Sequence, residues 1–366
     1  MPNPIEIPEI LREPLSQFID PYLDIDYVSI KAIQQATLTD NNLNLTIKLG
    51  YPLERASHSL VAALSAHLQQ AVPSLTNINI QFHWQVGAHQ VLAKTKPMPN
   101  VKNMVAIASG KGGVGKSTTT VNLALALAQE GARVGILDAD IYGPSQAIMT
   151  GIPTGTKPKT QGNQYFIPLQ AHGLQVMSMG FLVDENTPMV WRGPMASGAL
   201  QQLLNQTLWD DLDYLFVDMP PGTGDIQLTL SQSLPVTASV IVTTPQDIAL
   251  LDAVKGIEMF RKVDIPVLGI IENMSTHICS NCGQEEAIFG HGGGDKLASQ
   301  YQTPLLGQLP LTLSIREQAD KGLPTVAAEP DSTTAQHYRD IALKTAALLS
   351  LQSRNTAIPN ITMVDE

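Results

Sequence analysis

A glycine-rich segment with two lysines carries the clearest chemical signal in the sequence. Residues 110–117 read Gly-Lys-Gly-Gly-Val-Gly-Lys-Ser and fit the pattern G-x-x-x-x-G-K-[ST] at every fixed position. Glycines let backbone N–H groups turn toward phosphate oxygens, and a helix that begins after the loop adds the positive end of its dipole. The segment therefore predicts a nucleotide phosphate site.

Two lysines and a serine give this loop its charge and its metal ligand. Lys116 is expected to reach the β- and γ-phosphates, and Ser117 is expected to hold Mg²⁺. Lys111 stands second in the loop, where a simple phosphate loop needs no charge, so a solvated loop lysine is the alternative. The residues predicted to contact the nucleotide are Gly110, Lys111, Gly112, Gly113, Val114, Gly115, Lys116, Ser117 and Thr118.

Three aspartates follow apolar runs. Asp138 and Asp140 come after residues 134–137, and Asp218 comes after residues 214–217. Acids at the carboxyl ends of parallel strands lie where doubly wound sheets bind ligands. We expect Asp218 to hold Mg²⁺ through water, Asp140 to orient the attacking water and Asp138 to support the metal shell. The alternative for each is a cap on a helix or turn.

The chain has only two cysteines, and they are two residues apart. Cys279 and Cys282 can both face one metal centre, but the spacing alone also fits half a zinc site, a redox dithiol or two free thiols. Because such centres usually take four protein ligands, a bound cluster would most simply lie between two copies of the chain. His277 and His291 are spare ligand candidates, and an ordinary loop histidine is the alternative for both.

The elements that must position these residues alternate along the chain. Short, almost continuously apolar runs are separated by helical patterns, which predicts βαβ units around a mostly parallel sheet. The predicted strands are residues 104–108, 134–137, 214–217, 239–242 and 267–271. Residues 118–128 form the helix predicted after the phosphate loop, and residues 334–351 form the last predicted helix.

The first part of the chain has a different pattern. Strands are predicted over residues 28–37, 43–49 and 77–83, with a helix over residues 56–71, so a small α+β unit is expected. We predict four segments, with an α/β ATPase domain that contains the cysteine pair. They are the α+β domain 1–93, a Pro- and Lys-rich linker 94–103, the ATPase domain 104–351 and a flexible tail 352–366.

Composition limits the class of protein. The chain has 366 residues, 43% hydrophobic and 15% charged, which fits about two globular domains and excludes a disordered or coiled-coil protein. The net charge of −11 disfavours nucleic acid and anionic membranes as partners. The N-terminal residues have no basic segment typical of a signal peptide, and no apolar run approaches the length of a membrane span, so we expect a cytoplasmic location.

Taken together, these motifs resemble one family. The loop with its extra lysine is similar to the deviant Walker A loop, and the chain resembles the Mrp (ApbC) iron–sulfur cluster carrier ATPases over nearly its whole length. The residues up to 93 resemble, more weakly, a MIP18-like domain. The segments that carry the ATPase resemblance are residues 99–103, 110–117, 138–145, 218–225, 272–274, 277–283 and 288–294.

The resemblance implies roles for several residues. Lys111 would reach the phosphates across a homodimer interface, as an arginine finger does, and Asn273 would hydrogen-bond the adenine. Cys279 and Cys282 would hold a labile [4Fe–4S] cluster shared by two subunits. The protein would bind ATP and Mg²⁺, hydrolyse ATP and transfer the cluster to apo-proteins.

Two other functions remain open at this point. One is a partition- or division-site-type positioning ATPase, which the negative charge and the C-terminal residues without a basic amphipathic face disfavour. The other is a non-catalytic scaffold with a structural zinc ion between subunits.

Overall fold

The computed structural model describes residues 6–89, 91, 95–162, 164–182, 193–279 and 282–352. The predicted tail 352–366 lies outside these residues except for Gln352. Within the described part of the chain, no helix has both the length and the apolar character needed to cross a lipid bilayer.

The N-terminal unit, residues 6–89, has helices on a three-stranded sheet. Its elements are α1 (Glu9–Gln17), β1 (Ile33–Thr39), β2 (Asn42–Leu49), α2 (Ala56–Ala71) and β3 (Asn77–Trp84). Strand β2 is central, antiparallel to β1 and parallel to β3. The predicted helix over 56–71 and the predicted strands over 43–49 and 77–83 are confirmed.

The strand predicted over residues 28–37 is wrong in its first half. Residues 28–31 form a turn, and β1 begins only at Ile33. The reason is the Asp26 carboxylate, whose Oδ1 accepts hydrogen bonds from the backbone N–H groups of Val28 (2.9 Å) and Ser29 (2.8 Å). Such local bonds offer the backbone an alternative to a strand ladder.

Nine strands form the main sheet among the described residues. Their order is β13-β12-β11-β4-β10-β5-β9-β8, with β14 paired to β12. The bounds are β4 (Val101–Ala108), β5 (Val134–Asp138), β8 (Leu169–Ala171), β9 (Leu174–Ser178), β10 (Leu212–Asp218), β11 (Ala238–Thr243), β12 (Val267–Ile278), β13 (Glu285–Glu286) and β14 (Leu305–Leu311). A short hairpin joins β6 (Thr160–Gln161) to β7 (Tyr165–Phe166).

The predicted α/β fold with a mostly parallel sheet is confirmed. Only β8 and β13, at opposite ends of the strand order, pair antiparallel to their neighbours. Every residue of β5, β10 and β11 is buried, as expected of strands covered on both faces. Strand β4 begins at Val101 rather than the predicted Met104, because Val101 already pairs with Leu212.

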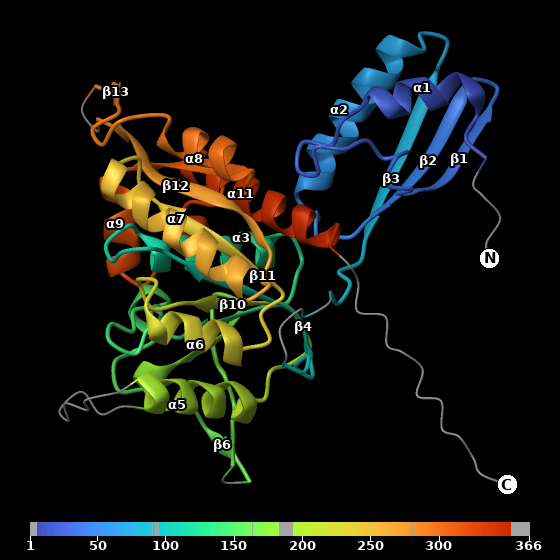
Figure 1. The fold of residues 1–366 in the computed structure, drawn as a ribbon. Coiled ribbons are helices and arrows are strands. Elements are labelled where there is room, and N and C mark those ends of the chain that lie inside the picture. The colour runs from blue at the N-terminus through green and yellow to red at the C-terminus, as the bar shows by residue number, and fades with distance from the viewer. Residues whose placement is uncertain are drawn as a thin grey trace, which may run out of the picture.

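Helices cover both faces of the sheet (Figure 1). One face carries α3 (Lys116–Gln129), α10 (Thr325–Ala328) and α11 (Thr333–Ser350), and the other carries α5 (Gly193–Gln206), α6 (Asp225–Ser233), α7 (Asp247–Lys262) and α8 (Gly293–Tyr301). The remaining helical segments are α4 (Gln146–Met149), α9 (Leu313–Asp320) and the 3₁₀ turn Met179–Phe181. The last predicted helix is confirmed as α11.

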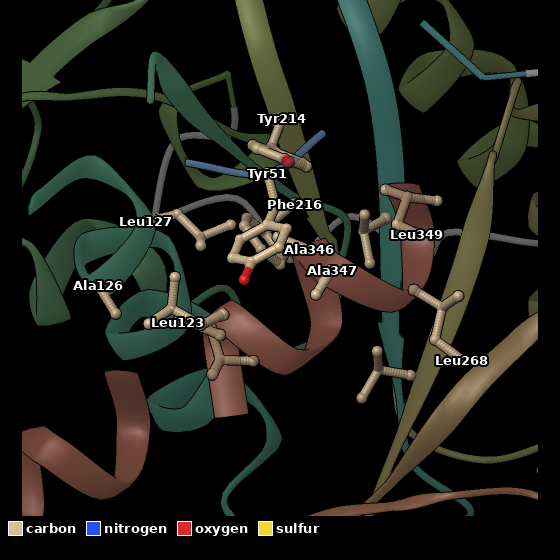
Figure 2. Packing of buried hydrophobic residues seen from close by; sticks show 14 of the residues in the cluster. Tyr51, Leu123, Ala126, Leu127, Tyr214, Phe216, Leu268, Ala346, Ala347 and Leu349 are labelled. Carbon is tan, nitrogen blue, oxygen red and sulfur yellow. The ribbon is translucent and has the colours of Figure 1, made fainter. Parts of the chain in front are cut away.

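A single hydrophobic cluster runs through the sheet, its helices and the N-terminal unit. Leu123 and Leu127 of α3 lie near Ala346 and Ala347 of α11 (Figure 2). Because α3 starts at the phosphate loop and is buried along most of its length, this packing fixes the helix that presents the loop.

The far end of α3 supports the N-terminal unit. The Glu130 carboxylate is fully buried, and its Oε2 accepts the backbone N–H groups of Arg55 (2.8 Å) and Ala56 (2.9 Å), where α2 begins. These are donors that a helix cannot satisfy within itself. Burial raises the pKa of Glu130, while the Arg55 and Ala56 hydrogen bonds and nearby Arg339 lower it. A side chain of the sheet domain therefore caps a helix of the N-terminal unit.

We predict that Glu130→Ala lowers the free energy of unfolding by about 1–3 kcal/mol, because buried donors lose their acceptor. The control is Asp331→Ala, which removes an exposed ion pair with Arg55 and should cost less than about 1 kcal/mol. Urea titration measures both, and limited proteolysis between Trp84 and Val101 reports whether the N-terminal unit detaches. Equal, small losses in both variants would contradict the capping role of Glu130.

Candidate functional site

The phosphate loop lies between β4 and α3, as the sequence predicts. Gly115 has a left-handed backbone (φ +81°), and a Cβ there would lie 2.2 Å from Nδ2 of Asn273. At Gly110 a Cβ would lie 2.3 Å from the backbone of Asp252. Both positions therefore require glycine, and the loop backbone is pressed between β12 and α7.

The structure brings Lys116, Ser117 and Asp218 together. The Lys116 ammonium pairs with Oδ1 of Asp218 and lies 3.2 Å from Oγ of Ser117. Thr120 Oγ1 also donates to Asp218 Oδ1, at 3.3 Å. Lys116 is 6% exposed and Asp218 is 0% exposed, so this is a buried ion pair whose lysine occupies the base of the loop.

Asp138 lies beside Asp218 at the end of the neighbouring strand. The two residues are direct partners in the parallel register of β5 and β10. The Asp138 carboxylate accepts bonds from the backbone N–H groups of Asp140, Ser145 and Gln146 (3.0–3.2 Å) and from the Ser178 hydroxyl (3.1 Å). Burial, and then the charge of Asp218, raise the pKa of Asp138 to about 7.

Asp140 begins the turn that follows β5. Its Oδ1 accepts the Gly143 N–H at 3.2 Å, and the residue is 9% exposed. Burial raises the pKa of this carboxyl group, and the nearby Lys116 lowers it. The structure therefore places all three sequence-predicted acids at the same edge of the sheet as the phosphate loop.

The oxygens at this edge fit a hydrated Mg²⁺ ion. Ser117, Asp138, Asp140 and Asp218 offer only hard oxygen donors, which Mg²⁺ prefers. Two further buried oxygens, Oγ of Ser145 and Oε1 of Gln146, have no hydrogen-bond partner among the residues that the structure describes. Buried polar atoms are normally paired, so unpaired oxygens beside a group of carboxylates match a site that receives water and a cation.

A cavity of about 300 Å³ opens beside Gly115. Its wall includes Thr118, Asn273, Pro310, Leu311 and Tyr338. The predicted adenine ligand Asn273 therefore borders a space next to the phosphate loop, although its Nδ2 donates to the Val114 carbonyl oxygen at 2.8 Å. Much of this wall comes from β14 and α9, neither of which was predicted from the sequence.

Lys111 contacts helix α7. Its Nζ donates to Oε1 of Gln246, the residue before α7, at 3.3 Å. On the same helix Ile248 is 70% exposed and Leu251 is 65% exposed. The extra lysine thus lies next to an apolar surface at the start of α7.

The cysteine pair lies in a hairpin at the end of β12. Cys279 N–H donates to the Gln284 carbonyl (3.0 Å), and Gly283 N–H donates to the Cys279 carbonyl (2.8 Å). Cys279 is half-buried and Cys282 is exposed, while Ser280 and Asn281 are outside the described residues. Within the described ranges, no group of three or more His, Cys, Asp or Glu side chains could hold a metal ion by itself. Neither this hairpin nor the aspartates beside the phosphate loop therefore form a complete metal site, and a Mg²⁺ ion at the aspartates would need water and nucleotide oxygens as further ligands.

The two spare histidines differ in their surroundings. Nδ1 of His277 lies 3.1 Å from the Leu311 carbonyl oxygen, and His277 pairs with Glu286 across the β12–β13 hairpin. His291 is exposed in the loop before α8.

Strand β12 connects the phosphate loop with the cysteine hairpin. Asn273 contacts the loop, and Cys279 follows six residues later, at most about 20 Å away.

The parallel sheet, the glycine loop before α3 and the carboxylates at the strand ends define a P-loop nucleotide-binding protein. The NUBPL iron-transfer P-loop NTPase family matches residues 100–346, and a family of iron-sulfur cluster assembly proteins matches residues 9–82. The chain belongs to the NUBPL iron-transfer P-loop NTPase family. This confirms the family that the motifs indicated.

Relatives with known names are similar in sequence to this chain over most of its length. An iron-sulfur cluster carrier protein of Pseudomonas fragi is 62% identical over 279 residues, covering 75% of this chain and 97% of that protein. One of Escherichia coli K12 is 50% identical over 354 residues and covers 94% of both. A nucleotide-binding protein of Archaeoglobus fulgidus, solved with ADP, has a TM-score of 0.54 and 36% identity, over 61% of this chain and 87% of that one.

We predict that Lys116→Met weakens Mg²⁺-ATP binding at least about tenfold, a loss of about 1.4 kcal/mol or more, because the phosphates lose a charged donor. Calorimetric titration measures the affinity. Lys255→Met is the control, because Lys255 is a largely exposed lysine of α7 paired with Asp252, and it should leave the affinity unchanged. Unaltered ATP affinity in Lys116→Met would contradict the proposed phosphate site.

Proposed function

We propose that the protein is an ATP-hydrolysing carrier that binds an iron–sulfur cluster between two copies of the chain and transfers it to apo-proteins. The observation that carries this proposal is the joint presence of a complete phosphate loop and an exposed cysteine hairpin at the end of one strand, β12. Relatives named iron-sulfur cluster carrier protein, which align with both segments, support it.

The buried charges suggest how the nucleotide is bound. Backbone N–H groups of residues 110–118 surround the phosphates, and Lys116 moves from Asp218 to the phosphate oxygens. Mg²⁺ would be held by Ser117 and, through water, by Asp218, with Asp138 supporting this shell, and it would neutralise charge that develops on the phosphates. Asp140 then orients the attacking water.

The cysteines argue for a dimer. One chain supplies two thiols, whereas a [4Fe–4S] cluster usually takes four cysteine ligands. Two copies related by a two-fold axis would present Cys279 and Cys282 twice. The exposed Ile248 and Leu251 next to Lys111 support a second copy on this side, since burying apolar surface favours association. Lys111 of one copy would then reach the nucleotide of the other.

We predict that anaerobic reconstitution gives about four irons and about four sulfides per two chains, with broad visible absorbance. Cys279→Ala and Cys282→Ala should each lose most of this iron, because half of the ligands are removed from the shared site. Lys116→Met is the matched control, because it changes the nucleotide site and should keep the iron. Metal analysis after purification without oxygen provides the measurement.

Two results would contradict the cluster site. Unchanged iron and sulfide in Cys279→Ala would show that the cluster is held elsewhere. Zinc that remains bound through iron reconstitution would instead favour the structural scaffold between subunits.

We further predict that Lys111→Ala lowers ATP turnover at least about tenfold, because a charge comparable to an arginine finger is lost, while nucleotide affinity stays within about twofold. Mixed dimers test whether Lys111 acts across the interface. Mixing Lys111→Ala with Lys116→Met should restore turnover, since the first has an intact loop and the second supplies the missing Lys111. Turnover that stays low in the mixture, with mixed dimers verified by mass, would place Lys111 in its own subunit's site.

A further inference from the structure

Gln146 is a fully buried polar residue that touches the nucleotide site from a helix the motifs did not single out. It is the first residue of α4, and its side chain is 0% exposed. Its Nε2 donates to Oδ2 of Asp218 at 2.8 Å and to the carbonyl oxygen of Ser117 at 3.0 Å. The amide therefore bridges the two residues that are proposed to hold Mg²⁺.

The bridge matters most when Lys116 leaves. In this structure the Asp218 carboxylate has its Oδ1 paired with Lys116 and bonded to Thr120, and its Oδ2 bonded to Gln146. Once Lys116 turns to the phosphates, the Thr120 bond of 3.3 Å and the Gln146 bond of 2.8 Å are the side-chain hydrogen bonds of Asp218 that remain among the described residues. The shorter of the two comes from Gln146, which is also tied to the loop.

The oxygen of the same amide is an acceptor that can take a further hydrogen bond. Oε1 of Gln146 is buried and has no hydrogen-bond partner in the described part of the chain. An amide oxygen is a good acceptor for the water molecules that surround a hydrated cation. A glutamate at this position would add a further negative charge next to the buried Asp138 and Asp218, so a neutral amide suits the place.

We propose that Gln146 is a positioning residue for Mg²⁺: it holds the Asp218 carboxylate at a fixed place relative to Ser117, and its Oε1 accepts a hydrogen bond from the hydration shell of the ion. This inference rests on the nucleotide site of the proposed function and is independent of the cysteine hairpin. It makes Gln146 a determinant of how strongly the nucleotide complex responds to Mg²⁺.

The test measures ADP affinity by calorimetry at increasing Mg²⁺ and, separately, with the metal removed by EDTA. For Gln146→Leu we expect the Mg²⁺ concentration that half-maximally tightens ADP binding to rise at least about tenfold, as it does when a residue that hydrogen-bonds a metal ligand is replaced. ADP affinity in EDTA should stay within about twofold of the wild type, since the phosphate loop itself is unchanged.

Gln175→Leu is the matched control. Gln175 is another buried glutamine, in strand β9, and its amide bonds the backbone of Asp210 rather than the nucleotide site. It should leave both affinities at the wild-type value. Gln146→Met keeps the length of the side chain without its amide and carries the same expectation if Gln146→Leu does not fold.

The outcomes separate this inference from the proposed function. A wild-type Mg²⁺ response in a folded Gln146 variant would overturn the positioning role. Loss of ADP binding equally with and without Mg²⁺ would overturn it too, because that pattern belongs to a residue that only supports the loop. If the ADP affinity of the wild-type protein does not change with Mg²⁺, the proposed Mg²⁺ site of the nucleotide complex is wrong.

Discussion

The positions of the phosphate loop and its neighbours depend on two buried carboxylates that lie side by side. Asp138 and Asp218 end neighbouring parallel strands, and neither is exposed. Such charges are costly to bury unless cations or donors meet them. In this structure Lys116 supplies the cation for Asp218, and three backbone N–H groups and Ser178 supply donors for Asp138. The start of α3 must therefore bring Lys116 to Asp218, and the turn after β5 must bring its backbone N–H groups to Asp138.

The same requirement links distant parts of the chain. Helix α3 presents Lys116 at one end and, just past the other, Glu130, which caps α2 of the N-terminal unit. On the opposite side of the loop, β12 carries Asn273 against Val114. The preceding Glu272 is buried and accepts the Gly294 N–H at the start of α8, after the cysteine hairpin. The loop is thus linked to the N-terminal unit through α3 and Glu130, and to the hairpin region through Asn273 and β12.

Much of this arrangement could be predicted from the sequence. Buried parallel strands are continuously apolar, so β5, β10 and β11 were recognisable, and the loop, the three aspartates and the cysteines have fixed spacings. Features that depend on particular side-chain hydrogen bonds were not predicted. The Asp26 turn replaced a strand over residues 28–31, because a side-chain acceptor competed with the ladder. Gln146 was missed because its only sequence signal is a polar residue ahead of Ala-Ile-Met, and its meaning comes from contacts with Ser117 and Asp218.

Under the proposed function, nucleotide binding depends on one exchange, in which Lys116 leaves Asp218 for the phosphates. The most direct measurement is a crystal structure of the wild-type chain with Mg²⁺ and a non-hydrolysable ATP analogue. We predict that the Lys116 ammonium donates to phosphate oxygens and no longer contacts Asp218, while Gln146 keeps its bond to Asp218. A nucleotide-bound structure in which Lys116 still pairs with Asp218 would contradict this.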